Sequence, residues 1–415
     1  MSAKNKIVFL FVFFICFSYR CVAQIDTRAI ARDYYTGIVK ILLFDSLAEK
    51  QNPGSGYLGR GSGFFVTDDG VIFTNRHVID YCVFGYVHFD YYDEQTDNTS
   101  SYREIYTEDR VRETNVVKIN STGYTVPIIQ VYSGKGEKDY KLYYAKVLAL
   151  SNGSFDGAML KIVSDLNGNP VNEKFFSLPV GNSDSTEQGE DLCVYGYPAG
   201  HEGGFDIMLN DMSTLTVGKH SGFDYLFDKD FGHIKTDASI NSGNSGGPVF
   251  NQDTKVIGIA TATATTGNLG LVGGINAMYY VAASQLELLL QLAGKGLKTP
   301  KKSGSVSTIS GEHVPMLSQK EIEALNKKKQ SDTDALIAKK QEEKQEEAYK
   351  AFISTARANN PRINMNLGAA VGISSYARGT LDVFWQTINN DPSLSATGKG
   401  SPFFWKADWQ MMGSD

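Results

Sequence analysis

Three short segments of the sequence contain the residue types that nucleophilic catalysis by a serine requires. Such catalysis uses a hydroxyl, an imidazole that takes its proton, a carboxylate that holds the imidazole, and N–H donors where negative charge develops. The segments are centred on His77, Asp156 and Ser245. Alone, each is ambiguous, because a lone histidine is more often structural and an aspartate before a strand is a common turn residue. The combination is specific.

The serine segment reads Gly243-Asn244-Ser245-Gly246-Gly247-Pro248. Glycines on both sides of Ser245 permit a tight backbone that points successive N–H groups into one concavity, and Pro248 then leads into a strand. The histidine follows a predicted hairpin, which ends where a short helical turn begins at His77. Asp156 stands directly before the apolar run Ala158 to Ile162. All three candidates therefore lie at the ends of predicted strands.

Short β-branched and aromatic runs, separated by Gly, Asn, Asp and Ser, extend from Gly37 to about Val281. Many short strands at this spacing favour an all-β barrel or sandwich over βαβ units. A leucine-rich helix is predicted to follow, around residues 284–294, and to complete a domain over residues 24–296.

These motifs together resemble the trypsin-like serine proteases, and among them the HtrA/Deg branch. That family has a GSGF stretch, a TN-HV histidine, a D-x-A-x-L aspartate and a GNSGGP serine in this order, as here over about residues 35 to 285. The resemblance implies an all-β, chymotrypsin-like fold of two six-stranded antiparallel barrels, with the site between them. It implies a serine endopeptidase with a triad of His77, Asp156 and Ser245. The backbone N–H groups of Gly243, Asn244 and Ser245 are then expected to form the oxyanion hole.

The same resemblance assigns the substrate pocket. Ser239 is expected at its base, and Thr261, Ala262 and Thr263 along one wall. None of these is charged, so we expect a small or medium uncharged P1 residue in the substrate. We expect polypeptide substrates and neither a metal nor an organic cofactor.

Two features depart from the family. The 79 residues from His77 to Asp156 include a tyrosine-rich, acidic insertion at about residues 89–144. After the protease segment, the sequence has no pattern typical of a PDZ domain, so the peptide sensing of HtrA proteins is not carried over.

The first 23 residues predict secretion. Lys4 and Lys6 precede an apolar run from Ile7 to Phe17, and Cys21-Val22-Ala23 is typical of a signal-peptidase site. We expect a secreted or periplasmic protein. Removal of the signal leaves Cys82 and Cys193, which either form a disulfide or remain as two buried thiols.

The region after residue 296 changes in character. Residues 297–317 are rich in Ser, Gly, Lys and Pro and are predicted to be a linker. Ser318 and Glu321 form a capping box that opens a charged helix over residues 318–358. Residues 359–415 contain stretches of alternating apolar and polar residues. They resemble strands of an outer-membrane β-barrel, so association with an outer membrane or a surface complex is one hypothesis, and a small sheet is the other.

Composition excludes other classes of protein. The chain of 415 residues has 42% hydrophobic and 21% charged residues and a net charge of −6, as is typical of a folded protein. No basic patch is interleaved with aromatic residues, so we expect no nucleic-acid partner. The alternative to an enzyme is a catalytically silent protease fold that serves as a binding module, anchored by its C-terminal tail.

Overall fold

The computed structural model describes most of the chain between residues 24 and 359. The chain divides into two compact units, residues 1–322 and 323–415. The predicted signal peptide and nearly all of the predicted β-rich tail lie outside the described residues, which are 24–93, 95–134, 139–198, 212–225, 230–263, 269–301 and 306–359.

Six antiparallel strands of the first unit form the first barrel. Their order is β8-β7-β1-β2-β3-β9, and the barrel closes because β9 pairs back with β8. Alternate residues of β1 point inward, so Val39, Ile41 and Leu43 are buried in the barrel core. The strands are β1 (Ile38–Phe44), β2 (Tyr57–Phe65), β3 (Val71–Thr74), β7 (Val126–Tyr132), β8 (Tyr140–Asn152) and β9 (Ala158–Asp165).

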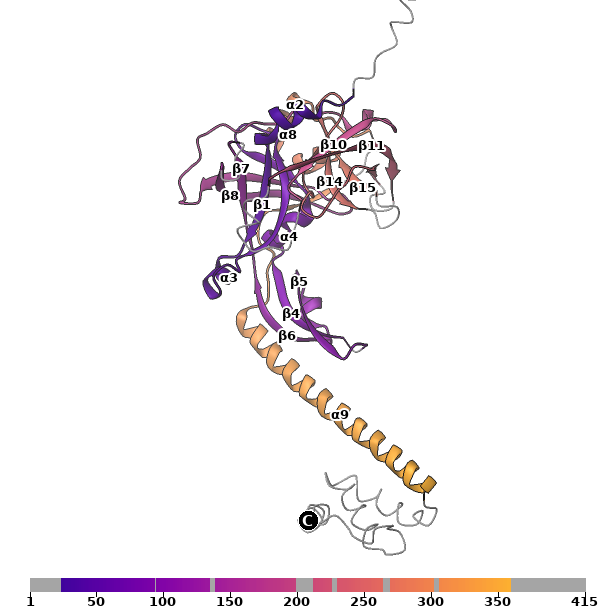
Figure 1. Cartoon of the computed structure of the whole chain (residues 1–415). Helices are drawn as coiled ribbons and strands as arrows, with labels where there is room; N and C mark the ends of the chain where they lie inside the picture. Colours follow the sequence, from indigo (N-terminus) through magenta and orange to yellow (C-terminus); the bar gives the residue numbers. More distant parts are fainter. Residues whose placement is uncertain are drawn as a thin grey trace, which may run out of the picture. The chain divides into compact units, whose positions relative to one another are not determined.

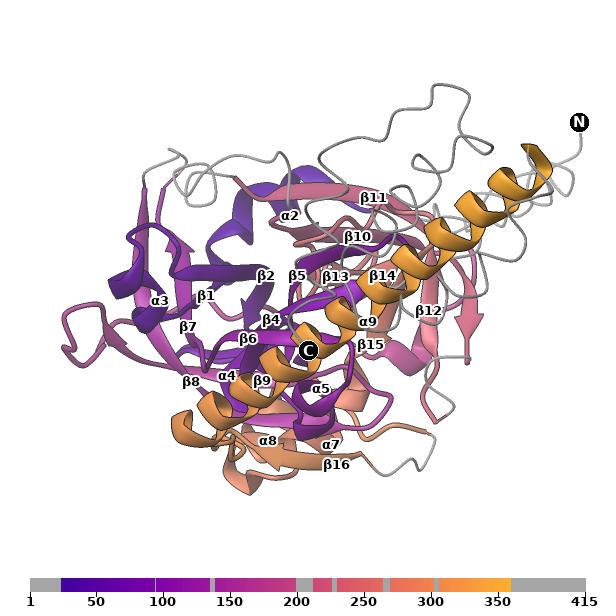
Figure 2. The ribbon, with the colours of Figure 1, turned by 90° about the horizontal axis from the view of Figure 1, so that it is seen from below.

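A second closed barrel follows in the order β10-β11-β12-β15-β14-β13. Figure 2 shows its strands beside those of the first barrel. Both barrels have six antiparallel strands, which confirms the predicted chymotrypsin-like fold class. The strands are β10 (Asp191–Gly196), β11 (Thr214–Asp224), β12 (His233–Thr236), β13 (Pro248–Phe250), β14 (Val256–Thr263) and β15 (Gly270–Gly274).

A third core lies outside the two barrel interiors. It joins residues of both barrels, such as Phe64 and Tyr195, to Ile30 of the first helix and Leu292 of the leucine-rich helix. Short helices connect the strands. They are α2 (Thr27–Asp33), η1 (Tyr35–Gly37), α3 (Ser46–Gln51), α4 (Arg76–Val83), η2 (Ser183–Ser185), η3 (Ile275–Ala277), α7 (Met278–Ala282) and α8 (Leu286–Lys295). Four of them, α2, η3, α7 and α8, contribute residues to this core.

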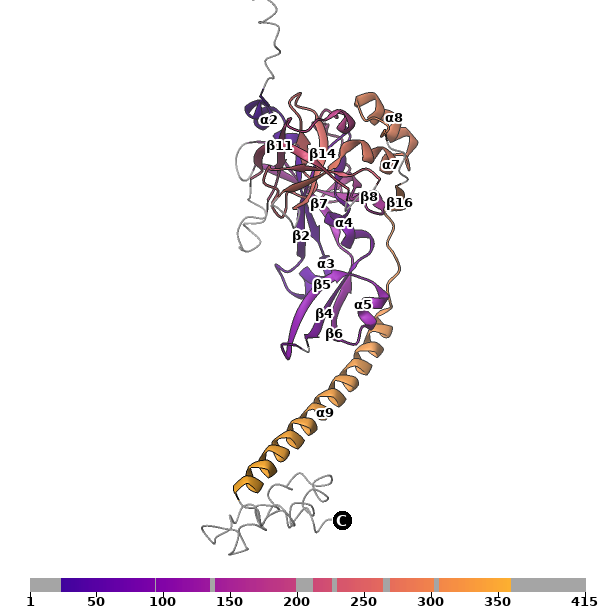
Figure 3. The ribbon, with the colours of Figure 1, turned by 90° about the vertical axis from the view of Figure 1, so that its right-hand side faces the viewer.

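The stretch between His77 and Asp156 contributes to two sheets. β4 (Tyr86–Asp93) pairs with β5 (Asn98–Ile105) and with β6 (Val116–Gly123), and these three strands form a sheet of their own beside α5 (Glu108–Arg112). Figures 1 and 3 show this sheet extending away from the barrels. β7 and the start of β8 lie in the predicted insertion but belong to the first barrel. The separate sheet therefore runs from Tyr86 to Gly123, whereas the predicted insertion runs from about residue 89 to 144.

The segment predicted as a linker makes contacts with other parts of the first unit. β16 (Ser307–Ser310) pairs with the end of β8, and Figure 3 shows it beside α7. Further on, the N–H of Val314 donates to the carbonyl of Val83 at the end of α4 (2.8 Å), and that of Leu317 donates to the Tyr106 hydroxyl (2.9 Å). We call residues 306–317 the strap.

The long helix α9 (Gln319–Asn359) starts directly after Ser318. The side chain of Glu321 accepts from the N–H and the hydroxyl of Ser318, at 2.8 and 2.6 Å, so the expected capping box is present. No helix in the described part of the chain combines the length and the apolar character needed to cross a membrane.

Candidate active site

His77 is the second residue of α4. β3 ends at Thr74, and Asn75 is extended, with φ −80° and ψ 152°, so the chain turns there from strand to helix. Asp156 lies in the turn between β8 and β9. These positions agree with the strand ends and the helical turn that the sequence predicts.

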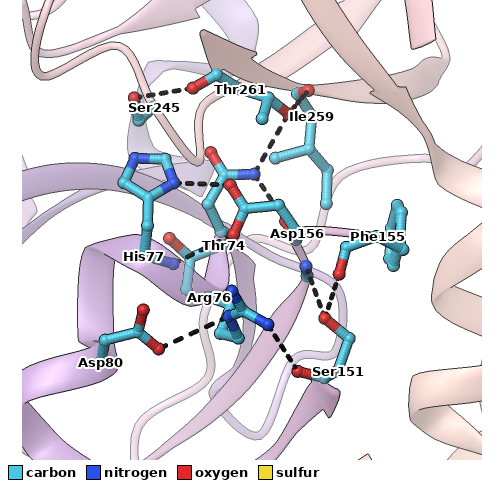
Figure 4. A network of polar contacts seen from close by, with 12 residues as sticks. Thr74, Arg76, His77, Asp80, Ser151, Phe155, Asp156, Ser245, Ile259 and Thr261 are labelled. Carbon is cyan, nitrogen blue, oxygen red and sulfur yellow. Dashed lines mark hydrogen bonds and ion pairs between the residues drawn. The ribbon is translucent and has the colours of Figure 1, made fainter. Parts of the chain in front are cut away.

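Two hydrogen bonds join these residues. The ring Nδ1 of His77 lies 2.5 Å from Oδ2 of Asp156, and the backbone N–H of His77 donates to Oδ1 at 3.0 Å. The carboxylate can only accept from the ring, so the pair favours the tautomer with the proton on Nδ1 and leaves Nε2 to act as a base. Figure 4 shows the carboxylate beside the imidazole.

The pairing shifts the pKa of both groups. Burial lowers the pKa of His77, but the hydrogen bond and charge of Asp156 outweigh it, so the pKa stands above its usual value. Burial likewise raises the pKa of Asp156, but the hydrogen bond and charge of His77 hold it below its usual value. At neutral pH, Asp156 is therefore ionised beside the imidazole.

Ser245 follows a tight turn. The N–H of Asn244 donates to the carbonyl of Asn241 at 3.0 Å, and Gly243, the third residue of this turn, has φ +90°. A positive φ at this position is the mark of a type II turn and favours glycine. Gly246 also has φ +88°, so both glycines are required by the backbone.

The hydroxyl of Ser245 donates to the carbonyl of Thr261 on β14, at 3.1 Å. Figure 4 shows this bond, with Ser245 and the ring of His77 on the same side of the carboxylate of Asp156. The structure thus brings the three predicted residues into one site, while the serine hydroxyl is engaged by β14 rather than by the imidazole.

The predicted oxyanion-hole residues differ in their backbone contacts. The N–H groups of Gly243 and Ser245 have no acceptor among the residues that the structure describes, whereas that of Asn244 already bonds to Asn241. Two of the three predicted N–H groups are therefore free to bind an anion. The side chain of Asn244 is buried, so it does not line the open side of this loop.

Residues beside the histidine, which the sequence alone did not single out, brace the Asp156 turn. The amide of Asn75 donates to the carbonyl of Asp156 (2.8 Å) and to the hydroxyl of Thr261 (3.3 Å). The guanidinium of Arg76 donates to the carbonyl of Gly153 (3.3 Å) and lies 3.6 Å from Asp80, too far for a hydrogen bond. Their only sequence signal was their place in the Thr74-Asn75-Arg76-His77 motif.

Asp80 lies one helical turn after His77 and is almost fully buried. Burial raises the pKa of Asp80 to about 6, against the opposing charge of Arg76. The charge of Asp80 in turn favours a protonated His77.

The predicted pocket residues have different surroundings. Ser239 is exposed, and its carbonyl accepts from the hydroxyl of Thr216 at 2.9 Å. Thr261 is buried and contacts both Asn75 and Ser245. The side chains of Ala262 and Thr263 lie outside the described residues, although both belong to β14.

The two remaining cysteines do not form a disulfide with each other. Cys82 and Cys193 are free and buried, and burial raises the pKa of each thiol to about 12. Of the two alternatives for this pair, the structure has the buried thiols. Within the described ranges, no group of three His, Cys, Asp or Glu side chains is placed to hold a metal ion.

Comparison with known proteins gives the family. Residues 61–259 match the family model of the trypsin-like peptidase domain. This match confirms the resemblance to trypsin-like peptidases that the motifs indicate.

Similar relatives include two probable periplasmic serine endoproteases, described as DegP-like, from Chlamydia trachomatis and Chlamydia pneumoniae. Both are 30% identical to this chain, over 54% and 58% of it and over 32% and 36% of their own lengths. The chain thus spans about a third of the length of these curated relatives. Among solved structures, that of Deg5 is similar with a TM-score of 0.37 and 23% identity, covering 60% of this chain and 88% of Deg5.

Proposed function

We propose that this chain is a serine endopeptidase that hydrolyses peptide bonds of polypeptides through a triad of His77, Asp156 and Ser245. The observation that carries the proposal is the double hydrogen bond between His77 and Asp156, beside a serine on a glycine-rich turn. The family match to the trypsin-like peptidase domain agrees with it.

In the proposed mechanism, Nε2 of His77 takes the proton of the Ser245 hydroxyl while the oxygen attacks the carbonyl carbon of the scissile peptide bond. The free N–H groups of Gly243 and Ser245 bind the resulting oxyanion. His77 then gives the proton to the leaving amine as the C–N bond breaks. Water, deprotonated by the same imidazole, hydrolyses the acyl-enzyme and restores the serine.

This mechanism requires one local change in the free enzyme. The Ser245 hydroxyl has to leave the Thr261 carbonyl and turn towards His77, which is a change of side-chain rotamer. Hydrogen bonds between catalytic groups are often loose before substrate binds. Binding of a peptide beside Ser245 is expected to favour the catalytic rotamer.

We further propose that the protein acts outside the cytoplasm. The predicted signal peptide supports this location, and so do the relatives that are described as periplasmic endoproteases. Association with an outer membrane through residues 359–415 stays a prediction from the sequence.

Reaction with a fluorophosphonate probe tests the proposed function, because the probe labels a serine only where a base activates it. We expect the full-length protein to be labelled and Ser245→Ala not to be. Ser242→Ala, which removes a hydroxyl from the same loop, serves as the matched control and is expected to be labelled. A folded wild-type protein that is not labelled would favour the binding-module alternative.

For specificity, we propose a small or medium uncharged P1 residue. Ser239, at the family position of the pocket base, is exposed and carries no charge. Cleavage of a peptide library tests this proposal, and a strong preference for Lys or Arg at P1 contradicts it.

A further inference from the structure

Ser62 of β2 is completely buried and binds to both barrels. Its N–H donates to the carbonyl of Ser245, and its carbonyl accepts from the hydroxyl of Thr74, each at 2.8 Å. Its hydroxyl donates to the carbonyl of Gly243 at 2.6 Å and accepts from the N–H of Tyr197 at 2.8 Å. A single side chain of the first barrel thus bonds to the loop that carries the nucleophile.

The direction of the hydroxyl bond follows from its partners. A serine hydroxyl has one proton and accepts with its lone pairs. Because the N–H of Tyr197 is a donor, it occupies a lone pair of the Ser62 oxygen and leaves the proton for the carbonyl of Gly243. The N–H of Tyr197, directly after β10, therefore sets the hydroxyl to point at the serine loop.

The bond constrains the peptide between Gly243 and Asn244. The carbonyl of this planar unit is held by Ser62, and its N–H is held by the carbonyl of Asn241. With both ends held, Gly243 keeps its φ of +90°. That conformation determines where the adjacent N–H groups of Gly243 and Ser245 point, and these are the two free donors of the loop.

Packing at Gly246 supports the same constraint. A Cβ atom on Gly246 would lie 2.0 Å from the carbonyl oxygen of Ser62 and 2.3 Å from the hydroxyl of Thr74. The serine loop therefore lies directly against β2, and Ser62 can act on it without an intervening side chain.

We propose that Ser62 is a positioning residue for acyl transfer, because its hydroxyl fixes the turn that aims the oxyanion-binding N–H groups of Gly243 and Ser245. The inference rests on the proposed function of Ser245 as nucleophile. Ser62 is fully buried and touches no substrate, so it acts through the backbone of Gly243. Its loss should weaken binding of the transition state more than binding of the substrate.

The test compares full-length wild type, Ser62→Ala and Ser183→Ala. Ser183 is a matched control, because it is also a buried serine whose hydroxyl accepts a backbone N–H, that of Asn276 at 3.1 Å. Hydrolysis of a fluorogenic peptide with alanine or valine at P1 gives kcat and KM, and a peptide aldehyde reports on affinity for the tetrahedral adduct. Loss of one oxyanion donor costs about 10²- to 10³-fold, so we expect misdirected donors in Ser62→Ala to lower kcat roughly 10- to 100-fold.

In Ser62→Ala we expect a KM within about twofold of wild type, and we expect the aldehyde to bind more weakly by a factor similar to the loss in kcat. The control Ser183→Ala is expected to have wild-type kinetics. Wild-type kcat and aldehyde affinity in a folded Ser62→Ala overturn the inference. If Ser62→Ala does not fold, Ser62→Cys keeps the volume with a weaker donor, and a wild-type kcat in that variant also overturns it. Failure of the wild type to react with the aldehyde and with fluorophosphonate overturns the proposed function itself, which is a different result.

Discussion

His77 and Asp156 are joined twice, once through the ring Nδ1 at 2.5 Å and once through the backbone N–H of His77 at 3.0 Å. The backbone bond holds the carboxylate at the start of α4, and the ring bond then sets the tautomer of the imidazole. Because the two bonds go to different oxygens, the carboxylate has little freedom to rotate. The proposed base is therefore held in one orientation before substrate arrives.

Asp156→Asn should abolish most activity while leaving the fold intact. An asparagine amide can donate to Nδ1, which favours the tautomer with the proton on Nε2, the wrong one for a base. We expect kcat to fall by about 10³- to 10⁴-fold, measured on the fluorogenic peptide at constant pH. Asp80→Asn removes a carboxylate of α4 that is one turn from His77 and should keep kcat within about tenfold. Equal losses in both variants would contradict the assigned role of Asp156.

The pH dependence of kcat/KM should follow His77. Only the neutral imidazole acts as a base, so activity rises with pH through the pKa of His77, which lies above the usual value of about 6.5. Burial lowers this pKa, the carboxylates of Asp156 and Asp80 raise it, and the charge of Arg76 lowers it. We expect Asp80→Asn to move the acid limb to lower pH and Arg76→Gln to move it to higher pH. Shifts in the same direction would contradict this electrostatic assignment.

The sequence predicts the three proposed catalytic residues better than it predicts the residues that hold them in place. The motifs around His77, Asp156 and Ser245 are local, and the strand ends they mark are present in the structure. The role proposed for Ser62 depends on which atoms of the second barrel meet β2, and no local pattern encodes that contact. Thr261 was expected only as a pocket wall, yet its carbonyl holds the hydroxyl of Ser245.

Asp80 should make the stability of the fold depend on pH. Its pKa is raised to about 6, so the folded state binds its proton more tightly than the unfolded chain does. The stability that Asp80 contributes to the wild type is therefore lost as pH rises from about 4 to above 6, whereas Asp80→Asn has no such group. We expect the free energy of unfolding of Asp80→Asn, relative to wild type, to increase by up to about 3 kcal/mol across this window. Urea unfolding at a series of pH values measures it, and a constant difference between the two proteins would contradict it.

Gly246→Ala should disrupt the contact between the serine loop and β2. The new Cβ would lie 2.0 Å from the carbonyl oxygen of Ser62, on a residue with φ +88°. We expect a loss of roughly 3 to 5 kcal/mol in stability and no measurable peptidase activity. Gly189 provides a control, because it has φ +97° but no atom within 4 Å of the position that a Cβ would take. Gly189→Ala should cost only about 1 kcal/mol and remain active.

Residues 297–317 make contacts that their composition does not reveal. Their Ser, Gly, Lys and Pro content is typical of a linker, yet Ser307 to Ser310 form the strand β16. The strand is possible because the end of β8 offers a free edge for backbone pairing. Backbone hydrogen bonds need no apolar pattern in the sequence, so hydrophobic periodicity could not reveal this pairing.

The strap should stabilise the first unit and, within it, the helix α4 that carries His77. It adds β16 to β8 and bonds through Val314 to the last turn of α4. A chain that ends at Lys301 loses both contacts, whereas one that ends at Ile322 keeps the whole first unit. We expect the shorter chain to lose about 2 kcal/mol, or roughly 4 to 8 °C in Tm, and to lose part of its kcat, because the end of α4 is released. The chain that ends at Ile322 should match the full-length protein in both measurements. Equal Tm and kcat in the two truncated chains would show that the strap adds neither stability nor activity.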